Sequence, residues 1–506
     1  MASFFSFFIN KRIPSPRTVR ALLHGPLTLY RAAVYVFLIS IVVVIFLILL
    51  TINNSFLVTV PARGGSVTEG IIGAPKTINP VLATTDTDKA LSALVYAGLI
   101  KIMPDGTVIN ELAEDYTVSP DNRIHTFTLK KSVFQDGKDL TSRDVAFTVS
   151  KLKNSALNPS SALYWADISI ETPDERTIVF TLPAPRATFL ERVAIGILPE
   201  HIWGSMTDEE FLSTKKNLTG IGAGPFDVTA INKADGVVEK LTFKRNSHYI
   251  LGAPLLKKMK VVVFDNQQEL LEAIHEKDIS FTSQLLPQTI TTNTLPKQFI
   301  TTQVPSVQQV ALYHLRGNGG ALSNAAFVTL LSQYIDKERI IAIVENGYGE
   351  ALDSSATPLE IEEVQAKLAN AGYQLKNGTL TRAGTSVGIS IATTNDPSLV
   401  ALANTLATEL RTLGITVSIR NFDQGFFNTE LENNTFSTVL LKGVEPPSSY
   451  EAVLPLYTTT VPFIVKSNTT IPIPTVLISP ILRYADIHEW YTNTDKLYSW
   501  ITTNKH

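Results

Sequence analysis

An alternation of apolar and polar residues predicts a β-hairpin near residue 120. Tyr116 and Val118 alternate with polar neighbours before the tetrapeptide Ser119-Pro120-Asp121-Asn122, and apolar positions alternate again over residues 125–129. Proline at the second turn position presets φ, and Asp and Asn tolerate a tight bend. The tetrapeptide is therefore expected to connect two antiparallel strands.

A helix is predicted to start directly after the next turn, at Asp136-Gly137. Thr141 can cap this helix, and Asp144, three residues later, can complete a capping box by bonding back to the backbone N–H of Thr141. Leu140 can pack on Val145 as a hydrophobic staple. We therefore expect the helix to begin near Ser142. Its buried stripe would consist of Val145, Ala146, Val149 and Leu152.

The remaining pattern mixes strands and helices and predicts an α/β fold. Residues 161–182 are typical of two strands on either side of a turn, and residues 289–303 of a Thr-rich surface loop or sheet edge. Helical spacing of apolar residues predicts helices over residues 267–274 and 325–345. Strand 387–391, helix 397–413 with a Gly414 stop, and strand 415–419 predict a βαβ unit with a right-handed parallel crossover.

An uncharged, almost wholly apolar run covers residues 32–52. Its 21 residues match the roughly 20 that cross a bilayer core. The preceding 31 residues carry five Lys and Arg and no acid, which predicts a cytoplasmic N-terminus with everything after the run outside. A cleaved signal peptide is the alternative, but its apolar region has only about 7 to 15 residues. A buried soluble helix would have a polar face, and this run has none.

Composition limits the classes of protein that fit. A chain of 506 residues, 44% apolar and 18% charged, is too long for a single hydrophobic core, so at least two lobes are expected. The absence of cysteine excludes disulfides, thiolate metal sites, Cys nucleophiles and a lipid-modified N-terminal Cys. The net charge of −3 gives no reason to expect nucleic-acid binding. Without the five basic residues of the tail, 38 Lys and Arg remain against 46 Asp and Glu, a net charge of −8, which argues against tight adhesion to anionic lipid beyond the anchor.

The hairpin, the Asp-Gly turn and the capped helix resemble, in residues and order, the signature of peptide/nickel-class (family 5) extracytoplasmic solute-binding proteins of ABC transporters. Other segments resemble this family in the same order, so that the resemblance covers nearly everything after Gly65. They are residues 73–80, 94–99, 220–226, 244–249, 252–254, 334–340, 382–420 and 483–491.

The resemblance implies a two-lobed, periplasmic-binding-protein-like α/β fold with a hinge and an interlobe cleft, preceded here by one transmembrane helix. The expected parts are a cytoplasmic tail (1–31), a transmembrane helix (32–52), a tether (53–65), lobe I (66–265), lobe II (266–455) and a return to lobe I (456–506). The protein would be a monomer on the outer side of the cell membrane. It would capture oligopeptides and deliver them to the permease subunits of an ABC transporter.

The resemblance also implies a site for the peptide's amino end. In peptide-binding relatives an Asp shortly after a Gly-Trp pair holds the terminal ammonium, and the corresponding stretch here is Gly443-Val444-Glu445. Val444 replaces the usual Trp, and Glu445 is the nearest acid. Glu445 is therefore either a longer version of the usual carboxylate or a solvated acid before Pro446-Pro447.

Further candidates for peptide contact come from the same resemblance, each with a structural alternative. Asn79, Thr85 and Asp86 follow the first strand and would face the cleft, although Asn79-Pro80 also fits a simple turn. Tyr313 and Asn318 lie near the crossing into lobe II, and Tyr313 also suits a core. The last two candidates are Trp165, at an expected strand start where aromatic residues often only pack, and Gly222, where the backbone would turn sharply at the cleft.

No set of residues indicates catalysis, a cofactor or a metal. Residues 220–224 hold three glycines, but Pro225 and a strand follow where a phosphate-binding loop needs a helix. Two Ser-x-x-Lys matches lack partner motifs, and the eight histidines show no i, i+4 pair. Three alternatives stay open: a surface signalling or interaction protein on the same fold, a binder of a nickel chelate or other non-peptide solute, and, more distantly, a hydrolase.

Overall fold

The computed structural model describes residue 17 and residues 28–276, 278–290, 295–352, 357–443 and 448–498. The chain divides into two compact units, Met1–Ala62 with Thr494–His506 and Arg63–Asn493. We describe each unit by itself.

The first unit contains one long helix and a two-stranded ribbon. Helix α3 (Thr28–Ser55) includes the predicted apolar run and is somewhat longer than that run. None of its apolar stretch Ala32–Leu49 is buried, and it is long and apolar enough to cross a membrane. Strand β1 (Leu57–Ala62) follows the helix and pairs with β22 (Asn493–Tyr498), the last strand described.

The second unit is built around one mixed sheet that has eleven strands in the part of the chain described here. They are β2 (Gly64–Ile72), β9 (Phe226–Ala234), β10 (Val237–Arg245), β11 (Leu256–Phe264), β12 (Phe281–Thr282), β13 (Phe299–Leu315), β14 (Gly349–Ala351), β18 (Gly388–Thr394), β19 (Thr416–Phe422), β20 (Thr438–Gly443) and β21 (Tyr450–Lys466). Their order is β19-β18-β20-β13-β21-β12-β2-β11-β10-β9, with β14 paired to β21.

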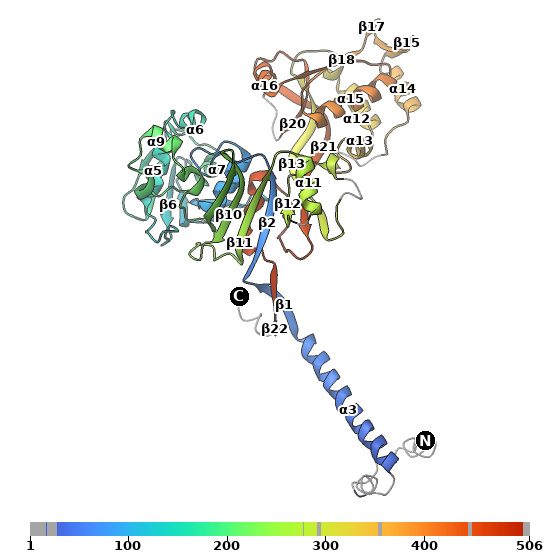
Figure 1. Cartoon of the computed structure of the whole chain (residues 1–506). Coiled ribbons are helices and arrows are strands. Elements are labelled where there is room, and N and C mark those ends of the chain that lie inside the picture. Colours follow the sequence, from blue (N-terminus) through green and yellow to red (C-terminus); the bar gives the residue numbers. More distant parts are fainter. Residues whose placement is uncertain are drawn as a thin grey trace. The chain divides into compact units, whose positions relative to one another are not determined.

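Two 17-residue strands of this sheet, β13 and β21, connect two separate hydrophobic cores. At one end of the pair Val304 and Phe463 pack into the first core, and at the other end Val310 and Leu456 pack into the second. Figure 1 shows the two strands side by side although they are far apart in the sequence. We refer to the parts of the second unit around these two cores as lobe I and lobe II.

Lobe I confirms the predicted hairpin and the predicted helix start. Strands β5 (Ala113–Val118) and β6 (Ile124–Leu129) pair antiparallel, with Tyr116 opposite Phe127. Helix α5 (Ser142–Leu152) has Thr141 as its N-cap. The backbone N–H of Thr141 donates to Asp144 Oδ2 over 2.9 Å, which is the predicted reciprocal contact.

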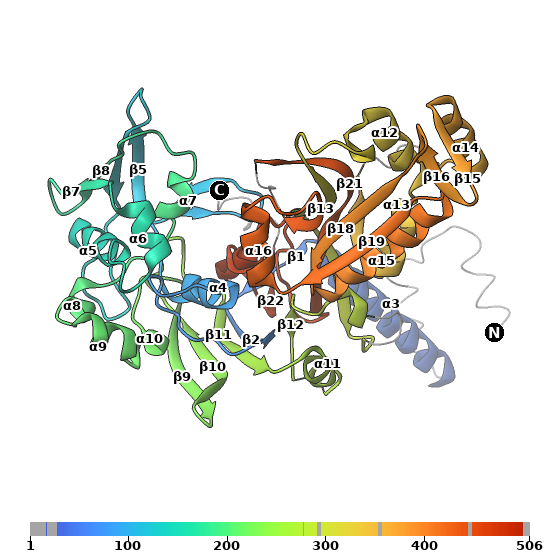
Figure 2. The same ribbon diagram turned by 90° about the horizontal axis from the view of Figure 1, so that it is seen from above.

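Lobe II confirms the predicted βαβ unit. Strands β18 and β19 are parallel neighbours, and α15 (Pro397–Thr412) connects them (Figure 2). Helix α15 packs into the second core, whereas α16 (Gln424–Glu432), between β19 and β20, packs through Phe427 and Leu431 into a smaller cluster. Because neighbouring residues of β18, Ile391 and Ala392, enter these two different clusters, the two helices cover opposite faces of the sheet.

Two predicted elements differ from the structure, and a third takes one of its two predicted forms. The helix expected over 325–345 is two helices, because Ile335 leaves the helical conformation and Asp336 caps a second one. Of the stretch 289–303, expected to be a surface loop or a sheet edge, residues 299–303 form an edge, because this part of β13 pairs with β21 whereas β20 pairs with β13 only from Gln309 onward. Trp165 does not start a strand but ends a short helix whose start is fixed by Asn158 as N-cap and Pro159.

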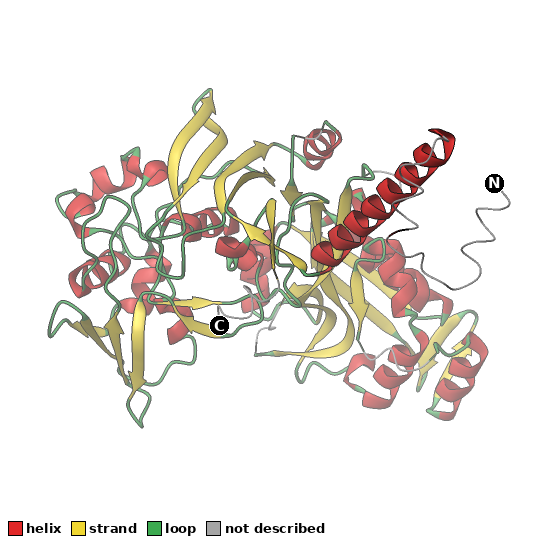
Figure 3. Ribbon diagram, turned by 90° about the horizontal axis from the view of Figure 1, so that it is seen from below, coloured by secondary structure: helices red, strands yellow, loops and turns green. Residues whose placement is uncertain are grey.

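The remaining elements intermix helices and strands along the second unit, as the predicted α/β class requires (Figure 3). The helices are α4 (Asp86–Val95), α6 (Pro159–Trp165), α7 (Phe189–Val193), α8 (Glu200–Trp203), α9 (Asp208–Ser213), α10 (Lys216–Thr219), α11 (Gln267–His275), α12 (Ala325–Tyr334), α13 (Lys337–Val344), α14 (Ile361–Asn370) and the 3-10 turns η1 (Pro287–Thr289), η2 (Ala321–Ser323), η3 (Pro480–Tyr484) and η4 (Ile487–Glu489). The strands are β3 (Ile100–Ile102), β4 (Val108–Asn110), β7 (Ser169–Glu171), β8 (Thr177–Thr181), β15 (Tyr373–Lys376), β16 (Thr379–Arg382) and β17 (Thr385–Ser386).

Candidate functional site

The carboxyl ends of β18 and β20 form a topological switch point in lobe II. The chain leaves β18 through α15 toward β19 on one side, then returns from β19 through α16 to β20 on the other side of β18. These two connections cover opposite faces of the sheet. In open α/β sheets such a point leaves a crevice outside the strand ends, and ligands bind there. This edge is therefore the candidate site.

The segments that follow the two strands bring polar groups to this edge. After β18, Asp396 caps α15, and its Oδ1 accepts hydrogen bonds from the backbone N–H groups of Ser398 and Leu399 over 2.8 and 3.2 Å. At the end of β20, Lys442 is exposed and Gly443 pairs in register with Gln309 of β13. Backbone, carboxylate and ammonium groups thus come together at one edge.

A buried carboxylate, Glu345, lies close to this edge at the end of α13. Tyr457 Oη of β21 donates to Glu345 Oε1 over 3.0 Å, and Gln288 Nε2 of η1 donates to Oε2 over 3.2 Å. Lys442 and Tyr457 lie in one row across the sheet, each opposite Val310 of β13, so their side chains leave the same face. The edge therefore joins charged groups from β20, β21 and α13.

Burial, hydrogen bonds and neighbouring charges shift the pKa values of Glu345, Asp396 and Tyr457. Burial raises the pKa of Glu345, and the positive charge of Lys442 partly offsets this effect. Burial would also raise the pKa of Asp396, but its hydrogen bonds with Ser398 and Leu399 and the charge of Lys442 outweigh it, so the pKa is lowered. Burial and the negative charge of Glu345 raise the pKa of Tyr457, which stays a neutral donor.

Of the candidates that the sequence suggested, Gly443 belongs to this edge. Gly443 is the last residue of β20. Val444 and Glu445 lie outside the described residues, so their role as contacts for a peptide's amino end stays a prediction. Gly443 itself lies at the carboxyl end of β20, next to the switch point.

Tyr313 and Asn318 are not brought together with Gly443. Tyr313 of β13 pairs with Val439, four residues before Gly443 on β20, or about 13 Å along the strand at 3.3 Å per residue. Its side chain is buried in the cluster that α16 covers. Asn318 is exposed beyond the end of β13, on the opposite side of the sheet from the carboxyl edge.

The candidates near the start of lobe I have local structural partners. Asn79 is fully buried, its Nδ2 donates to Asn217 Oδ1 over 3.0 Å, and its Oδ1 accepts from the backbone N–H of Val81. Thr85 caps α4 by accepting from the N–H of Asp88, and Asp86 is the exposed first residue of that helix. Of these side chains, Thr85 and Asp86 are the ones that reach solvent.

Trp165 and Gly222 also take part in packing within lobe I. Trp165 is 2% exposed and lies against the rings of Phe180 and Phe189. The N–H of Gly222 donates to Gln135 Oε1 over 2.8 Å, and a Cβ at this glycine would overlap the carbonyl oxygen of Val95. Glycine is needed there for a close approach between backbones and not for a positive φ.

Asp396, Lys442 and Glu345 are the residues of this edge that the sequence did not single out. Asp396 precedes Pro397 at the start of a predicted helix, a capping pattern that would have placed it at the end of a strand. Glu345 gave no such signal, because its partners Gln288 and Tyr457 are 57 and 112 residues away in the chain. Only the folded topology brings them together.

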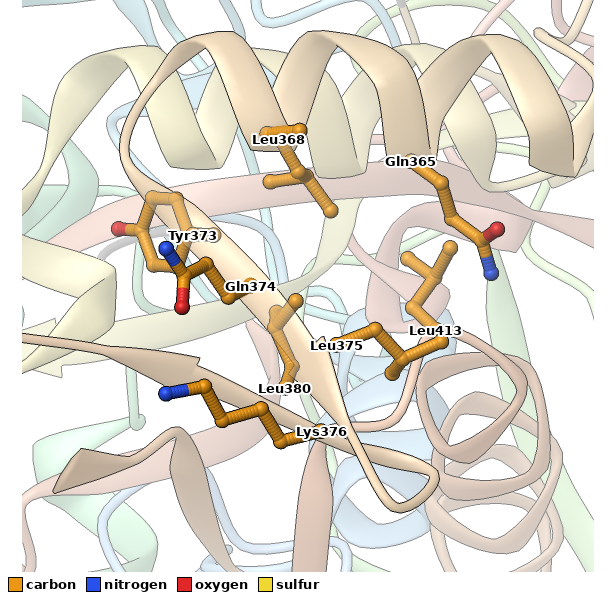
Figure 4. A pocket seen from close by; sticks show the side chains of 9 residues that line it. Gln365, Leu368, Tyr373, Gln374, Leu375, Lys376, Leu380 and Leu413 are labelled. Atoms are coloured by element: carbon orange, nitrogen blue, oxygen red, sulfur yellow. The ribbon is translucent and has the colours of Figure 1, made fainter. Parts of the chain in front are cut away.

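A cavity of about 400 Å³ lies elsewhere in lobe II. Figure 4 shows Gln365 and Leu368 of α14 above Tyr373 and Leu375 of β15, with Leu413 completing the wall. Strands β15 and β16 belong to a separate small sheet, so this cavity does not include the carboxyl edge of β18 and β20. Among the described residues, no three His, Cys, Asp or Glu side chains lie together so that they could hold a metal ion.

Comparison with known proteins decides the family. Residues 107–462 match the model described as bacterial extracellular solute-binding proteins, family 5 Middle. The chain belongs to this family. A putative ABC transporter peptide-binding protein of Brucella ovis is 32% identical over 180 residues, which are 35% of this chain and 33% of that protein. The chain thus matches about a third of the length of this relative.

Two further comparisons cover more of the chain. The probable D,D-dipeptide-binding periplasmic protein DdpA of Escherichia coli is 24% identical over 370 residues, 68% of each chain. The oligopeptide-binding protein AppA of Bacillus subtilis, solved with a nonapeptide, aligns over 85% of this chain and 99% of its own with a TM-score of 0.58 and 18% identity.

The nickel ABC transporter structure of Bacillus halodurans aligns over 83% of this chain and 98% of its own, with a TM-score of 0.67 and 14% identity. At these identities the solved structures establish the fold alone. That fold is the predicted two-lobed, periplasmic-binding-protein-like α/β architecture. The predicted lobe boundaries at residues 265 and 455 stay predictions.

Proposed function

We propose that this protein is a membrane-anchored, extracytoplasmic solute-binding protein that captures oligopeptides between its two lobes and delivers them to an ABC transporter permease. The observation that carries the proposal is the switch point of lobe II. Gly443, the first of the residues suggested for the peptide's amino end, is the last residue of the strand whose carboxyl end forms that point, and Val444 and Glu445 are next in the sequence.

Peptides suit this site better than other solutes for chemical reasons. An extended peptide can be held by main-chain hydrogen bonds at a sheet edge, and a carboxylate can pair with its terminal ammonium. Glu445 supplies that carboxylate in our proposal, and Lys442 is placed to meet the peptide's own acidic groups. The family includes relatives named for peptide binding, and AppA was solved with a nonapeptide.

The strands β13 and β21 supply the hinge in this proposal. Their register shifts between Pro305 and Gln309, so that the stretch between the two cores is not a regular ladder. A bulge bends a strand and interrupts its pairing, so bending is easiest there. Lobe closure around a peptide would bury it and give the permease a distinct shape to bind.

In this proposal the first unit supplies the anchor. Helix α3 would cross the membrane over residues 32–52, with the basic residues 1–31 inside the cell and the binding unit outside, as a monomer. The proposal assigns no catalytic step, cofactor or resident metal. A signalling protein on this fold would leave the site empty, and a nickel-chelate binder would take a metal complex in place of a peptide.

Thermal stabilisation of the full chain in lipid nanodiscs by a protein digest tests the proposal. A ligand present at 100 times its dissociation constant stabilises the folded state by about 2.7 kcal/mol, so a clear rise in Tm is expected. Acetylating the amino groups of the same digest should abolish most of the rise, because the ammonium that pairs with Glu445 is lost.

The variants Glu445→Ala and Glu451→Ala test the role of Glu445 at the peptide's amino end separately from peptide capture itself. Glu451 is an exposed acid of β21 at the end away from the carboxyl edge, so its variant should respond to the digest like the wild type. Glu445→Ala should lose the preference for free amino groups. If both variants respond alike, the amino-end assignment is wrong, and if no peptide stabilises the wild type, peptide capture is wrong. Stabilisation by a nickel–histidine complex alone would favour the metal-chelate alternative.

A further inference from the structure

Four lysines lie on one face of the lobe I sheet, where β10, β11 and β2 run side by side (Figure 1). Lys244 of β10 is directly opposite Lys258 of β11, and Thr242 is directly opposite Lys260. Residues that are opposite each other, and alternate residues of one strand, leave the same face of a sheet. The four side chains therefore point to the same side, and we call this surface the lysine face: Lys240, Lys244, Lys258 and Lys260.

The lysine face is the outer side of this sheet. The intervening residues of the same strands are buried in the first core: Leu241, Phe243, Met259 and Val261. Lys244 and Lys258 are exposed, and the other two lysines are half-buried. Helix α11 covers the sheet only beyond the lysines, where Leu270 packs over Gly70 of β2.

The positive charges of this face have little compensation within the protein. Among the residues that the structure describes, none of the ion pairs includes one of the four lysines. Asp227 of β9 is opposite Lys244 but is half-buried, and it is the one acid in the rows that cross the face. Like charges directly opposite each other, as in Lys244 and Lys258, destabilise a sheet. A local cost of this kind without an internal gain is typical of a functional surface.

The chain keeps the lysine face within reach of the segment proposed as the anchor. Ser66 of β2 is paired in register with Lys258. It follows Ser55, the last residue of α3, by eleven residues, which span about 40 Å at most. A binding surface that is tethered so closely to a membrane meets that membrane at a high effective concentration, so even weak attraction to lipid suffices for contact.

We propose that the lysine face binds the anionic phospholipid headgroups of the outer leaflet and holds lobe I on the membrane surface. The inference rests on the proposed anchoring through α3. The net charge of −8 outside the tail argues against adhesion of the surface as a whole, and the lysine face is a local exception to it.

The composition of the face favours lipid over a protein partner. The residues that share its rows on β2 and β10 include Ser66, Thr68 and Thr242, and the rows hold no aromatic residue and no arginine in the described structure. Protein interfaces are enriched in aromatic residues and arginine and depleted in lysine. Clusters of lysine beside a membrane instead bind anionic lipid, with about a fivefold gain in affinity for each lysine.

Acetylation of lysines in the full-length protein tests the contact without a substitution. The protein would be placed in phosphatidylcholine nanodiscs with or without phosphatidylglycerol, and the modification rate of each lysine followed by mass spectrometry. With phosphatidylglycerol, Lys244 and Lys258 should react about fivefold more slowly at about 0.05 M salt and at their full rate at about 0.5 M, because salt screens the contact. Lys376, exposed in lobe II, should react alike in both discs.

Two double variants with the same change in charge separate the lysine face from the net charge. Lys258→Gln with Lys260→Gln removes half of the face, so the slowing of Lys244 should fall to about twofold or less. Lys257→Gln with Lys376→Gln is the matched control, because Lys257 is exposed but alternates with Lys258 along β11. In this control Lys244 should stay about fivefold slower.

Equal rates for Lys244 and Lys258 in both kinds of disc would overturn the lipid contact, and an acidic protein partner would give this result. Slowing that persists at high salt, or an equal effect of the two double variants, would overturn it as well. If the protein separates from discs of either composition during gel filtration, the anchor itself is wrong. Peptide capture does not enter this measurement, so its failure would be seen separately.

Discussion

The buried carboxylates of Glu69 and Asp227 differ in their hydrogen-bond partners. Glu69 of β2 is fully buried but accepts from Arg483 Nε over 3.0 Å and from Tyr484 Oη, so the returning C-terminal segment pairs with its charge. Asp227 of β9 is different, because its Oδ1 is buried without a hydrogen-bond partner in the described structure. Burial raises the pKa of Asp227 to about 6, although Lys244 and His248 oppose the rise.

Asp227→Asn is expected to stabilise the protein at neutral pH. The pKa of Asp227 is higher in the folded state (about 6) than in the unfolded state (3.8), so its contribution to stability is fully present below pH 3.8 and is lost as pH rises through 6. The difference between the two pKa values is worth about 3 kcal/mol at most, and partial exposure reduces this to about 1 kcal/mol.

Urea unfolding at pH 4.5 and pH 8 measures this effect. We expect Asp227→Asn to exceed the wild type by about 1 kcal/mol at pH 8 and by much less at pH 4.5. Glu239→Gln, at an exposed position of the neighbouring strand, is the control and should change little at either pH. A stability gain that is the same at both pH values would show that the charge of Asp227 is not its cause.

At the scale of elements, one carboxylate joins two helix starts. Asp144 Oδ2 accepts from the N–H of Thr141 at the start of α5, and its Oδ1 accepts from the N–H of Glu200 at the start of α8, both over 2.9 Å. Asp144 is buried in lobe I. The capping box predicted from the sequence therefore also positions a second helix, which the sequence pattern could not indicate.

Asp144→Ala should cost much more stability than the loss of an exposed capping box. It leaves two partly buried N–H donors without their acceptor and opens a cavity at the buried carboxylate, and we expect about 2–4 kcal/mol at pH 7. The control is Glu210→Ala in the exposed capping box of α9, where we expect about 0.5–1 kcal/mol. The urea unfolding midpoints of the two variants measure this difference. Equal losses of stability in both variants would mean that Asp144 acts only as a local cap.

Local patterns predicted the elements that local chemistry determines. The hairpin at 113–129, the start of α5 and the β18-α15-β19 unit follow from turn residues, caps and periodicity. Errors and open alternatives occur where tertiary contacts decide. For Phe299 and its neighbours the sequence left a loop and a sheet edge open, and pairing with β21, about 160 residues later, decides for the edge. Over residues 325–345 the apolar residues keep one helical spacing, although one helix ends at Tyr334 and Asp336 caps the start of a second.

At the scale of the whole molecule, the candidate site is a property of topology. The sequence led to Gly443 through a family resemblance, but nothing local shows that β20 ends beside β18. The register of β20, β13 and β21 aligns Lys442 with Tyr457, and Glu345, at the end of α13, joins them by accepting a hydrogen bond from Tyr457 Oη. Conversely, three of the suggested residues are buried within lobe I: Asn79, Trp165 and Gly222. The type of a single residue does not indicate whether it lines a cleft or packs in a core.

The identity of any molecule that the purified protein carries tests the central claim most directly. The full chain would be extracted from membranes under native conditions and denatured, and whatever it releases would be identified by mass spectrometry. The account predicts a mixture of short peptides with free amino ends, released by the wild type and by Glu451→Ala but largely lost from Glu445→Ala. Release of a single non-peptide solute, or of no ligand from a protein that peptide mixtures also fail to stabilise, would contradict it.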